Sequence, residues 1–132
     1  MSGTVQTIGD SPIQGLLTTP NHFQDMFAQA RSRAQPGEYI AIVITKPPET
    51  ICVILPPANS LLSADQGRYI FFDSHSRPQL GFSGSYMVEC GDERGLINRL
   101  QAVFTPLVME GGQQDYMQLM YNMFEGTVFQ SM

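Results

Sequence analysis

Two apolar stretches that lie close together in the chain, Tyr39–Ile44 (YIAIVI) and Thr50–Leu55 (TICVIL), decide the fold class. Both are short runs rich in β-branched residues, which is typical of strands that are buried on both faces. The turn between them contains Pro47 and Pro48. The pattern therefore predicts a β-hairpin of two buried strands.

Two further strands are predicted downstream of the hairpin. Arg68–Asp73 (RYIFFD) is aromatic and apolar, and Ser85–Glu89 (SYMVE) is a short strand-like segment. A polar loop at 56–67 precedes the first, and a loop containing Gly81 and Gly84 separates the two. Strands that follow one another without an intervening helix favour a mainly antiparallel sheet, here of four strands.

Helical spacing occurs on both sides of these strands. Thr19 followed by Pro20 predicts a helix start with the hydroxyl as N-cap, and apolar residues at positions 23, 26, 27 and 30 give this helix one buried face. A second helix is expected to begin at Asp92, a capping residue, and to end near Pro106. A third is expected over 113–124, after two glycines at 111–112.

This order of elements predicts an α+β fold, in which the four-stranded sheet is flanked by an N-terminal helix and two C-terminal helices. Residues 19–132 are expected to form a single α+β domain. The polar segment 1–18 has no clear periodicity and is expected to be a flexible arm.

The composition limits the classes of partner. Only 14% of the 132 residues are charged, the seven Lys and Arg are scattered, and the net charge is −5. A nucleic-acid-binding protein needs a clustered basic surface, so this class is set aside. No apolar stretch reaches the ~20 residues of a membrane span, and the polar start does not have the pattern of a signal peptide, so no membrane association is predicted.

The two cysteines, Cys52 and Cys90, indicate neither a disulfide framework nor a zinc site. Cys52 lies in a predicted buried strand, where a thiol is expected to be inert, and Cys90 lies at a strand–helix junction. With only two histidines at unrelated spacings, neither a metal site nor a cofactor is predicted. The cysteine usage favours a reducing compartment, hence a cytoplasmic location with the nucleus as the alternative.

Asp73-Ser74-His75, at the end of the third predicted strand, is the one group of residues with a clear chemical meaning. Residues i and i+2 of a strand project to the same side, so the Asp73 carboxylate and the His75 imidazole are expected to meet. Such a carboxylate fixes the tautomer of the ring and stabilises its charged form. A catalytic triad would need, in addition, a nucleophile within hydrogen-bond reach of the imidazole.

The decapeptide Tyr69–Pro78 (YIFFDSHSRP) resembles a signature of papain-like cysteine deubiquitinases, and it is similar to the one in the protease of the herpesvirus large tegument protein. In that family an aromatic strand ends in Phe-Asp-x-His, followed by a basic residue and a glycine-containing loop. The resemblance extends over residues 38–107 and implies half of a papain-like fold. It also implies that His75 is the general base and Asp73 its orienter.

The sequence departs from the family at the nucleophile. The family's catalytic cysteine lies well upstream, at the start of a helix, whereas no cysteine precedes Cys52 in this chain. Cys90 follows the motif, which is the wrong order for the family, so the nucleophile is missing. The resemblance therefore implies either a degenerate relative retained for binding, or the histidine-bearing part of a protease whose cysteine lies on other sequence.

The last predicted helix is rich in methionine and aromatic residues. Methionine side chains are flexible, which suits either an adaptable core or a pliable interaction face. Both interpretations remain open for Met117, Met120, Tyr121 and Phe124.

Three functions follow from these observations. The leading hypothesis is a non-catalytic protein-interaction domain in ubiquitin-related biology, on a degenerate papain-like scaffold, with ubiquitin or a ubiquitin-pathway protein as partner. The second is the histidine-bearing part of an active cysteine protease or deubiquitinase. The third is an oligomer-forming scaffold domain unrelated to ubiquitin. Self-association of the chain is left open.

Overall fold

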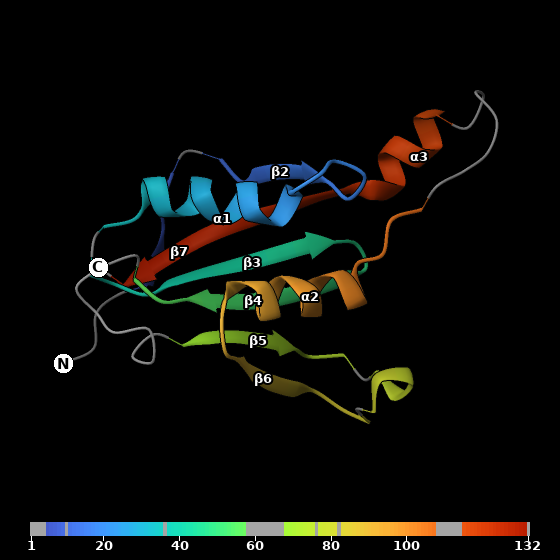
Figure 1. Cartoon of the computed structure of the whole chain (residues 1–132). Coiled ribbons are helices and arrows are strands. Elements are labelled where there is room, and N and C mark those ends of the chain that lie inside the picture. Colours follow the sequence, from blue (N-terminus) through green and yellow to red (C-terminus); the bar gives the residue numbers. More distant parts are fainter. Residues whose placement is uncertain are drawn as a thin grey trace.

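A computed structural model describes residues 5–9, 11–35, 37–57, 68–75, 77–81, 83–107 and 115–131 of the chain. These residues form one seven-stranded sheet in the order β1-β7-β3-β4-β5-β6, in which β2 also pairs with β7 and every neighbouring pair is antiparallel (Figure 1). The strands are β1 (Val5–Thr7), β2 (Ile13–Leu16), β3 (Ile40–Lys46), β4 (Glu49–Leu55), β5 (Tyr69–Asp73), β6 (Tyr86–Cys90) and β7 (Met123–Ser131). The helices are α1 (His22–Arg33), α2 (Glu93–Val103), α3 (Asp115–Asn122) and a short 3-10 helix (Pro78–Leu80). The α+β class is thus confirmed, with seven strands in place of the four expected.

The predicted hairpin is present as β3 and β4, which pair from Ile40 opposite Leu55 to Lys46 opposite Glu49. The expectation that both faces of these strands are buried is wrong for the described residues. One face, with Ile42, Ile44 and their neighbours, lies in the core, whereas alternate residues such as Val43 are only half-buried on the other face.

Strand β7 corrects the expected helix over 113–124. The helix α3 ends at Asn122, and the chain continues as a strand that pairs with β3 along Ile40–Thr45. Alternate residues of β7, including Phe124 and Val128, are buried. The first residues of this strand continue the apolar spacing of α3, so the sequence pattern does not mark the boundary between helix and strand.

The N-terminal segment also differs from the flexible arm that was expected. Val5–Thr7 and Ile13–Leu16 are strands, and both pair with β7. Ile13 and Leu17 are buried in the core. Residues 1–4 and 10 lie outside the described part of the chain.

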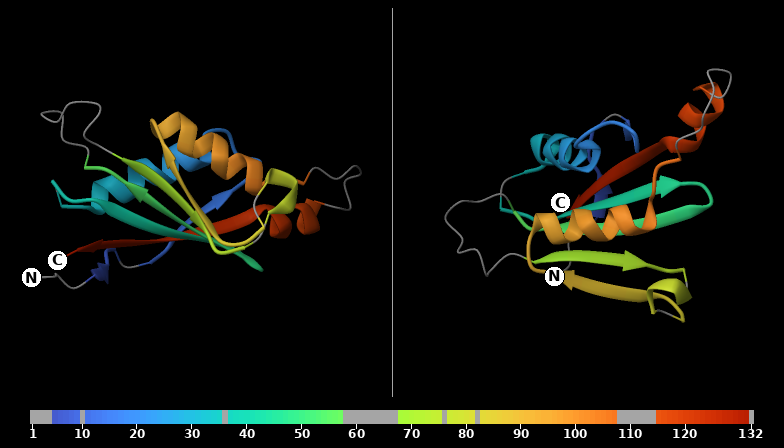
Figure 2. Two further views of the ribbon diagram at one scale, coloured as in Figure 1. Left: turned by 90° about the horizontal axis from the view of Figure 1, so that it is seen from below. Right: turned by 45° about the vertical axis from the view of Figure 1, so that its right-hand side comes forward.

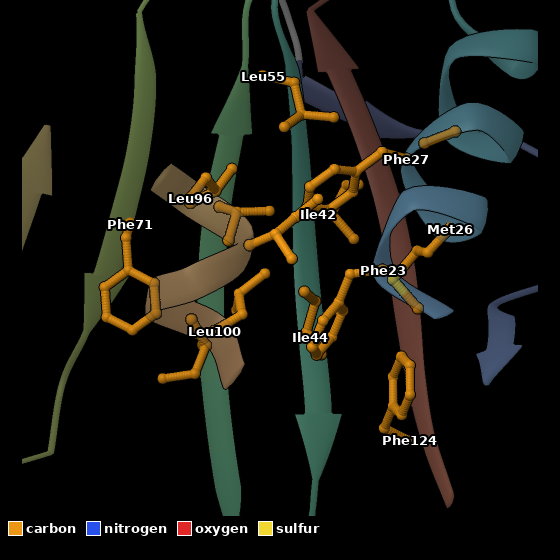
Figure 3. Close-up of a cluster of buried hydrophobic side chains, with 14 of the residues drawn as sticks. Phe23, Met26, Phe27, Ile42, Ile44, Leu55, Phe71, Leu96, Leu100 and Phe124 are labelled. Carbon is orange, nitrogen blue, oxygen red and sulfur yellow. The ribbon is translucent and has the colours of Figure 1, made fainter. Parts of the chain in front are cut away.

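The helices α1 and α2 cover one face of the sheet (Figure 2), and the core lies between them and the strands (Figure 3). The apolar face predicted for α1 is confirmed, because Phe23, Met26, Phe27 and Ala30 are all buried. Its start is corrected: Asn21, not Thr19, is the N-cap residue, with φ of 60° and no side-chain cap hydrogen bond. In α2 the predicted cap is confirmed, since the Asp92 carboxylate accepts the Gly95 N–H at 2.8 Å. None of the described helices combines the length and the hydrophobicity needed to cross a bilayer.

The close packing of α1 on β7 predicts a stability effect at Gly126. A Cβ at this position would lie 2.7 Å from Met26 Sδ and 2.9 Å from Ile42 Cγ2. Gly126→Ala should therefore lower the free energy of unfolding by about 1–3 kcal/mol, measured by urea denaturation. Gly84→Ala is the matched control, because a Cβ there meets nothing within 4 Å. Equal stabilities of the two variants would contradict the packing.

Candidate functional site

The Asp73 carboxylate lies at the end of β5 and is completely buried. Asp73 pairs with Ile51 of β4 on one side and with Tyr86 of β6 on the other, so strands flank it in both directions. Its side chain is on the same face of the sheet as Phe71, beneath the helix layer. A buried carboxylate requires hydrogen-bond donors around it.

Three donor groups around Asp73 come from the four residues that follow it, and the Tyr86 hydroxyl of β6 also interacts with its carboxylate. The His75 backbone N–H donates to Oδ1 at 2.9 Å, and the His75 ring nitrogen Nδ1 lies 3.0 Å from the same oxygen. Arg77 Nε donates to Oδ2 at 2.8 Å. The backbone bond closes a turn of the type that Asp favours after a strand. Asp73 therefore holds the shape of the segment that follows β5.

Arg77 connects this turn to the neighbouring strand. Its Nη2 donates to Glu49 Oε2 at 2.7 Å, so one mostly buried guanidinium joins the first residue of β4 to the last residue of β5. The planar guanidinium can serve two carboxylates at once, which a lysine cannot do in the same way. Sequence reasoning placed a basic residue after the motif but did not identify Glu49 as its second partner.

The charges in this cluster are coupled. Burial alone would raise the pKa of Asp73, but the hydrogen bonds from Arg77 and from the His75 backbone and ring outweigh it, so this pKa lies below its ordinary value. The hydrogen bond from Arg77 likewise lowers the pKa of Glu49. Burial, followed by the negative charge of Asp73, raises the pKa of the Tyr86 hydroxyl. At neutral pH the cluster therefore holds two carboxylates and one guanidinium in their charged forms.

The structure brings Asp73 and His75 together as the sequence predicted. Nδ1 of His75 faces the Asp73 carboxylate, which can only accept a hydrogen bond. The neutral ring therefore carries its proton on Nδ1, and Nε2 is left as the acceptor. The His75 side chain is 39% exposed, so solvent or a bound group can reach it. This geometry can orient a general base; whether His75 acts as one stays a prediction.

Neither thiol of the chain lies next to this imidazole. Cys52 pairs with Phe72, so its side chain is on the opposite face of the sheet from Asp73. Cys90 is on the same face as Tyr86, but it lies four residues further along β6, which places it about 13 Å from Tyr86. Burial raises the pKa of both thiols, which disfavours the nucleophilic thiolate. Cys52 was expected in the core, but it is half-buried on the face of the sheet opposite α1 and α2, which is called the open face below.

The helix α3 carries the second group of predicted site residues. Met117, Met120 and Tyr121 are 60%, 53% and 48% exposed, so none of them is a core residue. Together with Leu107 and Tyr116 they line an entirely apolar hollow of about 380 Å³. Phe124 does not share this surface, because it belongs to β7 and is buried against Phe23 and His22.

The base of α3 is anchored by Asn122, a buried polar residue that sequence reasoning missed. Its side chain accepts the Leu107 N–H and donates to the Leu107 carbonyl, both at 2.8 Å. Lys46, the last residue of β3, adds a contact, with Nζ 3.8 Å from the centre of the Tyr121 ring. The exposed apolar residues are thus held in place by polar contacts at one end.

The other histidine, His22, lies at the start of α1. Its Nδ1 is 2.8 Å from the Thr19 carbonyl oxygen, and its ring contacts Phe23 and Phe124. It lines a cavity of about 420 Å³ together with residues of β2, α1 and α3, and His75 is not among the lining residues. In the part of the chain that is described, no group of three or more His, Cys, Asp or Glu side chains is arranged to hold a metal ion.

The buried charge cluster predicts how the protein responds to acid. Because the folded-state pKa of Asp73 is depressed, its stabilising contribution is complete above the unfolded-state pKa of about 3.9 and is lost as the pH falls through the folded value. Asp73→Asn should lower the free energy of unfolding near pH 7 by about 3–5 kcal/mol, because Arg77 loses a charged partner. It should also flatten the decline in stability below about pH 5. Urea denaturation at several pH values measures both effects.

Glu38→Gln is the control for this experiment, since Glu38 is an exposed carboxylate outside the cluster. It should change the stability near neutral pH by no more than about 0.5 kcal/mol. The assignment would be refuted by an Asp73→Asn variant as stable as Glu38→Gln with an unchanged pH profile.

No protein-family model and no curated protein sequence matches this chain. Its structure matches five chains of known structure. One is the ubiquitin-specific protease encoded by a murine cytomegalovirus tegument protein, solved in complex with a ubiquitin-based suicide substrate. The TM-score is 0.55 at 15% sequence identity, and the match covers 96% of this chain and 47% of that chain. The chain therefore has a fold similar to about half of a viral ubiquitin-specific protease.

Proposed function

We propose that this chain is a protein-binding domain in ubiquitin-related biology that is not itself a protease. One observation carries the proposal: the His75 imidazole contacts a carboxylate but has no thiol of this chain beside it, on a fold similar to about half of a ubiquitin-specific protease. The fold favours ubiquitin or a related protein as partner. The geometry of the cysteines favours binding over catalysis.

The Asp73 cluster has a structural role that does not require catalysis. Its carboxylate is satisfied by Arg77 and by the His75 backbone as well as by the His75 ring. A triad orienter serves mainly its histidine, whereas this carboxylate also fixes a turn and pairs with a buried guanidinium. Retention of the motif in a binding domain is thus explained by stability.

The exposed surface of α3 is the proposed binding surface. It presents Met117, Met120 and Tyr121 beside a hollow with no polar lining, and such a patch is more apolar than ordinary solvent-exposed surface. Methionine side chains adapt to the shape of a partner. An exposed apolar patch on ubiquitin or a related protein would complement this surface.

A titration of isotope-labelled ubiquitin with the unlabelled chain tests this function by NMR. We expect a localised set of ubiquitin resonances to shift at sub-millimolar concentrations. Met120→Lys should weaken the binding on the order of tenfold, because it places a charge in the apolar contact. Gln101→Lys, which adds the same charge to the exposed side of α2, should leave the affinity unchanged. Absence of shifts at millimolar concentrations would remove ubiquitin as the partner.

A second candidate function is the histidine-bearing part of an active protease, with the cysteine supplied by other sequence. The observation that favours it is the 3.0 Å contact between His75 Nδ1 and Asp73, together with the 47% coverage of the viral protease. Ubiquitin carrying a C-terminal electrophile tests both candidates. If this chain is the histidine-bearing part of a protease, adding the sequence that supplies the cysteine should give an adduct at that cysteine, and His75→Ala should abolish it. On the leading proposal this chain alone forms no covalent adduct at Cys52 or Cys90. An adduct at either thiol, identified by mass spectrometry, would overturn the non-catalytic assignment.

A further inference from the structure

The face of the sheet opposite α1 and α2 has an unusual composition. Antiparallel pairing aligns its outward side chains into two rows across five adjacent strands, and a third, polar row of Glu125, Thr45 and Thr50 lies at one end of this face. The first row is Thr127, Val43, Cys52, Phe72 and Met87, and the second is Phe129, Ala41, Ile54, Ile70 and Glu89. An antiparallel sheet with one face in water normally carries polar residues there. The two longer rows of this face are mostly apolar instead.

Nothing among the described residues covers this face. Figure 2 shows α1 and α2 on the other side of the sheet, with no described element beneath β3–β6. Phe72 is 42% exposed and Met87 67% exposed, whereas Phe71, which points to the helices from the same strand, is fully buried. The apolar residues of the open face therefore contact water in a single copy of the chain.

The charge of the open face limits what can cover it. Glu89 is the one charged residue in the two longer rows, and it lies at the β6 edge, 3.5 Å from Arg68. Glu125 lies in the polar row on β7, so the charges of this face are at its rim. A strongly charged partner would gain little from such a surface, while two copies of it can approach without like charges meeting at the centre.

We propose that a second copy of the chain covers this face, so that two sheets pack face to face about a two-fold axis. Sheets pack in this way at about 10 Å with their strands roughly aligned. Ten side chains, each occupying about 4.8 by 6.8 Å, give a footprint on the order of 330 Å² per copy. This is smaller than the roughly 800 Å² per partner of a standard interface. The dimer is therefore expected to be weak and reversible.

The dimer places Cys52 near its centre. Cys52 lies on β4, the third of the five strands that form the face, in the row that contains Val43 and Phe72. Cys90 lies on the helix-covered face and serves as an internal reference. The proposed binding surface on α3 extends beyond the end of the sheet and stays accessible (Figure 1), so the dimer does not depend on the proposed function.

Sedimentation equilibrium of the full chain between about 1 and 500 μM tests the dimer. The average mass should rise with concentration toward twice that of one chain. Phe72→Lys combined with Met87→Lys should raise the dissociation constant on the order of tenfold or more, because it places charges in the interface. Met117→Lys is the matched control on α3, and it should leave the self-association unchanged. A mass that stays that of a single chain up to 500 μM, or self-association that only Met117→Lys disrupts, would overturn the proposal.

A second measurement needs no substitution. Alkylation of the two thiols of the wild-type chain is followed by mass spectrometry at both ends of the concentration range. The rate at Cys52 should fall severalfold as the dimer forms, while the rate at Cys90 stays constant. Equal rates at Cys52 in dilute and concentrated protein would refute the face-to-face arrangement even if the chain self-associates.

Discussion

The antiparallel pairing of β3 with β7 is the constraint on which the rest of the structure depends. It joins Ile40–Thr45 to Glu125–Gln130, two segments from opposite ends of the chain. Both N-terminal strands pair with β7, and α1 packs against it at Gly126, so these elements have no place in the sheet without it. Closing so long a loop costs conformational entropy, which is offset by burial of residues such as Ile42 and Val128.

This non-local pairing also explains how much of the fold the sequence could predict. The hairpin, the helix α1 and the capped helix α2 carry strong local patterns, and all three were predicted close to their observed bounds. The start of strand β7 was not, because Met123 and Phe124 continue the apolar spacing of α3; the environment of the buried Gln130 could not be predicted either. The Gln130 amide is satisfied by the backbone of Gln35, a partner that only the folded chain brings near.

The candidate site was likewise only partly predictable from the sequence. The sequence alone predicted that Asp73 and His75 meet, but it expected a continuing strand, whereas the contact is made in the turn that follows β5. The contact of Arg77 with Glu49 could not be predicted, since it depends on the register between β4 and β5. Exposure of Met117 and Met120 was equally undetermined, because an apolar helical pattern is the same whether the helix faces a core or a partner.

The charge cluster and the open face are linked through the register of β5. Strands that are apolar on both faces carry little information about which side chains point inward, so a slip by one residue costs them little. Asp73 removes this ambiguity: a slip would move its carboxylate to the open face, away from Arg77, and would turn Phe72 inward. Because Arg77 also binds Glu49, β5 is fixed relative to β4. The residues that resemble a catalytic pair thereby determine that Phe72 lies beside Cys52 on the open face.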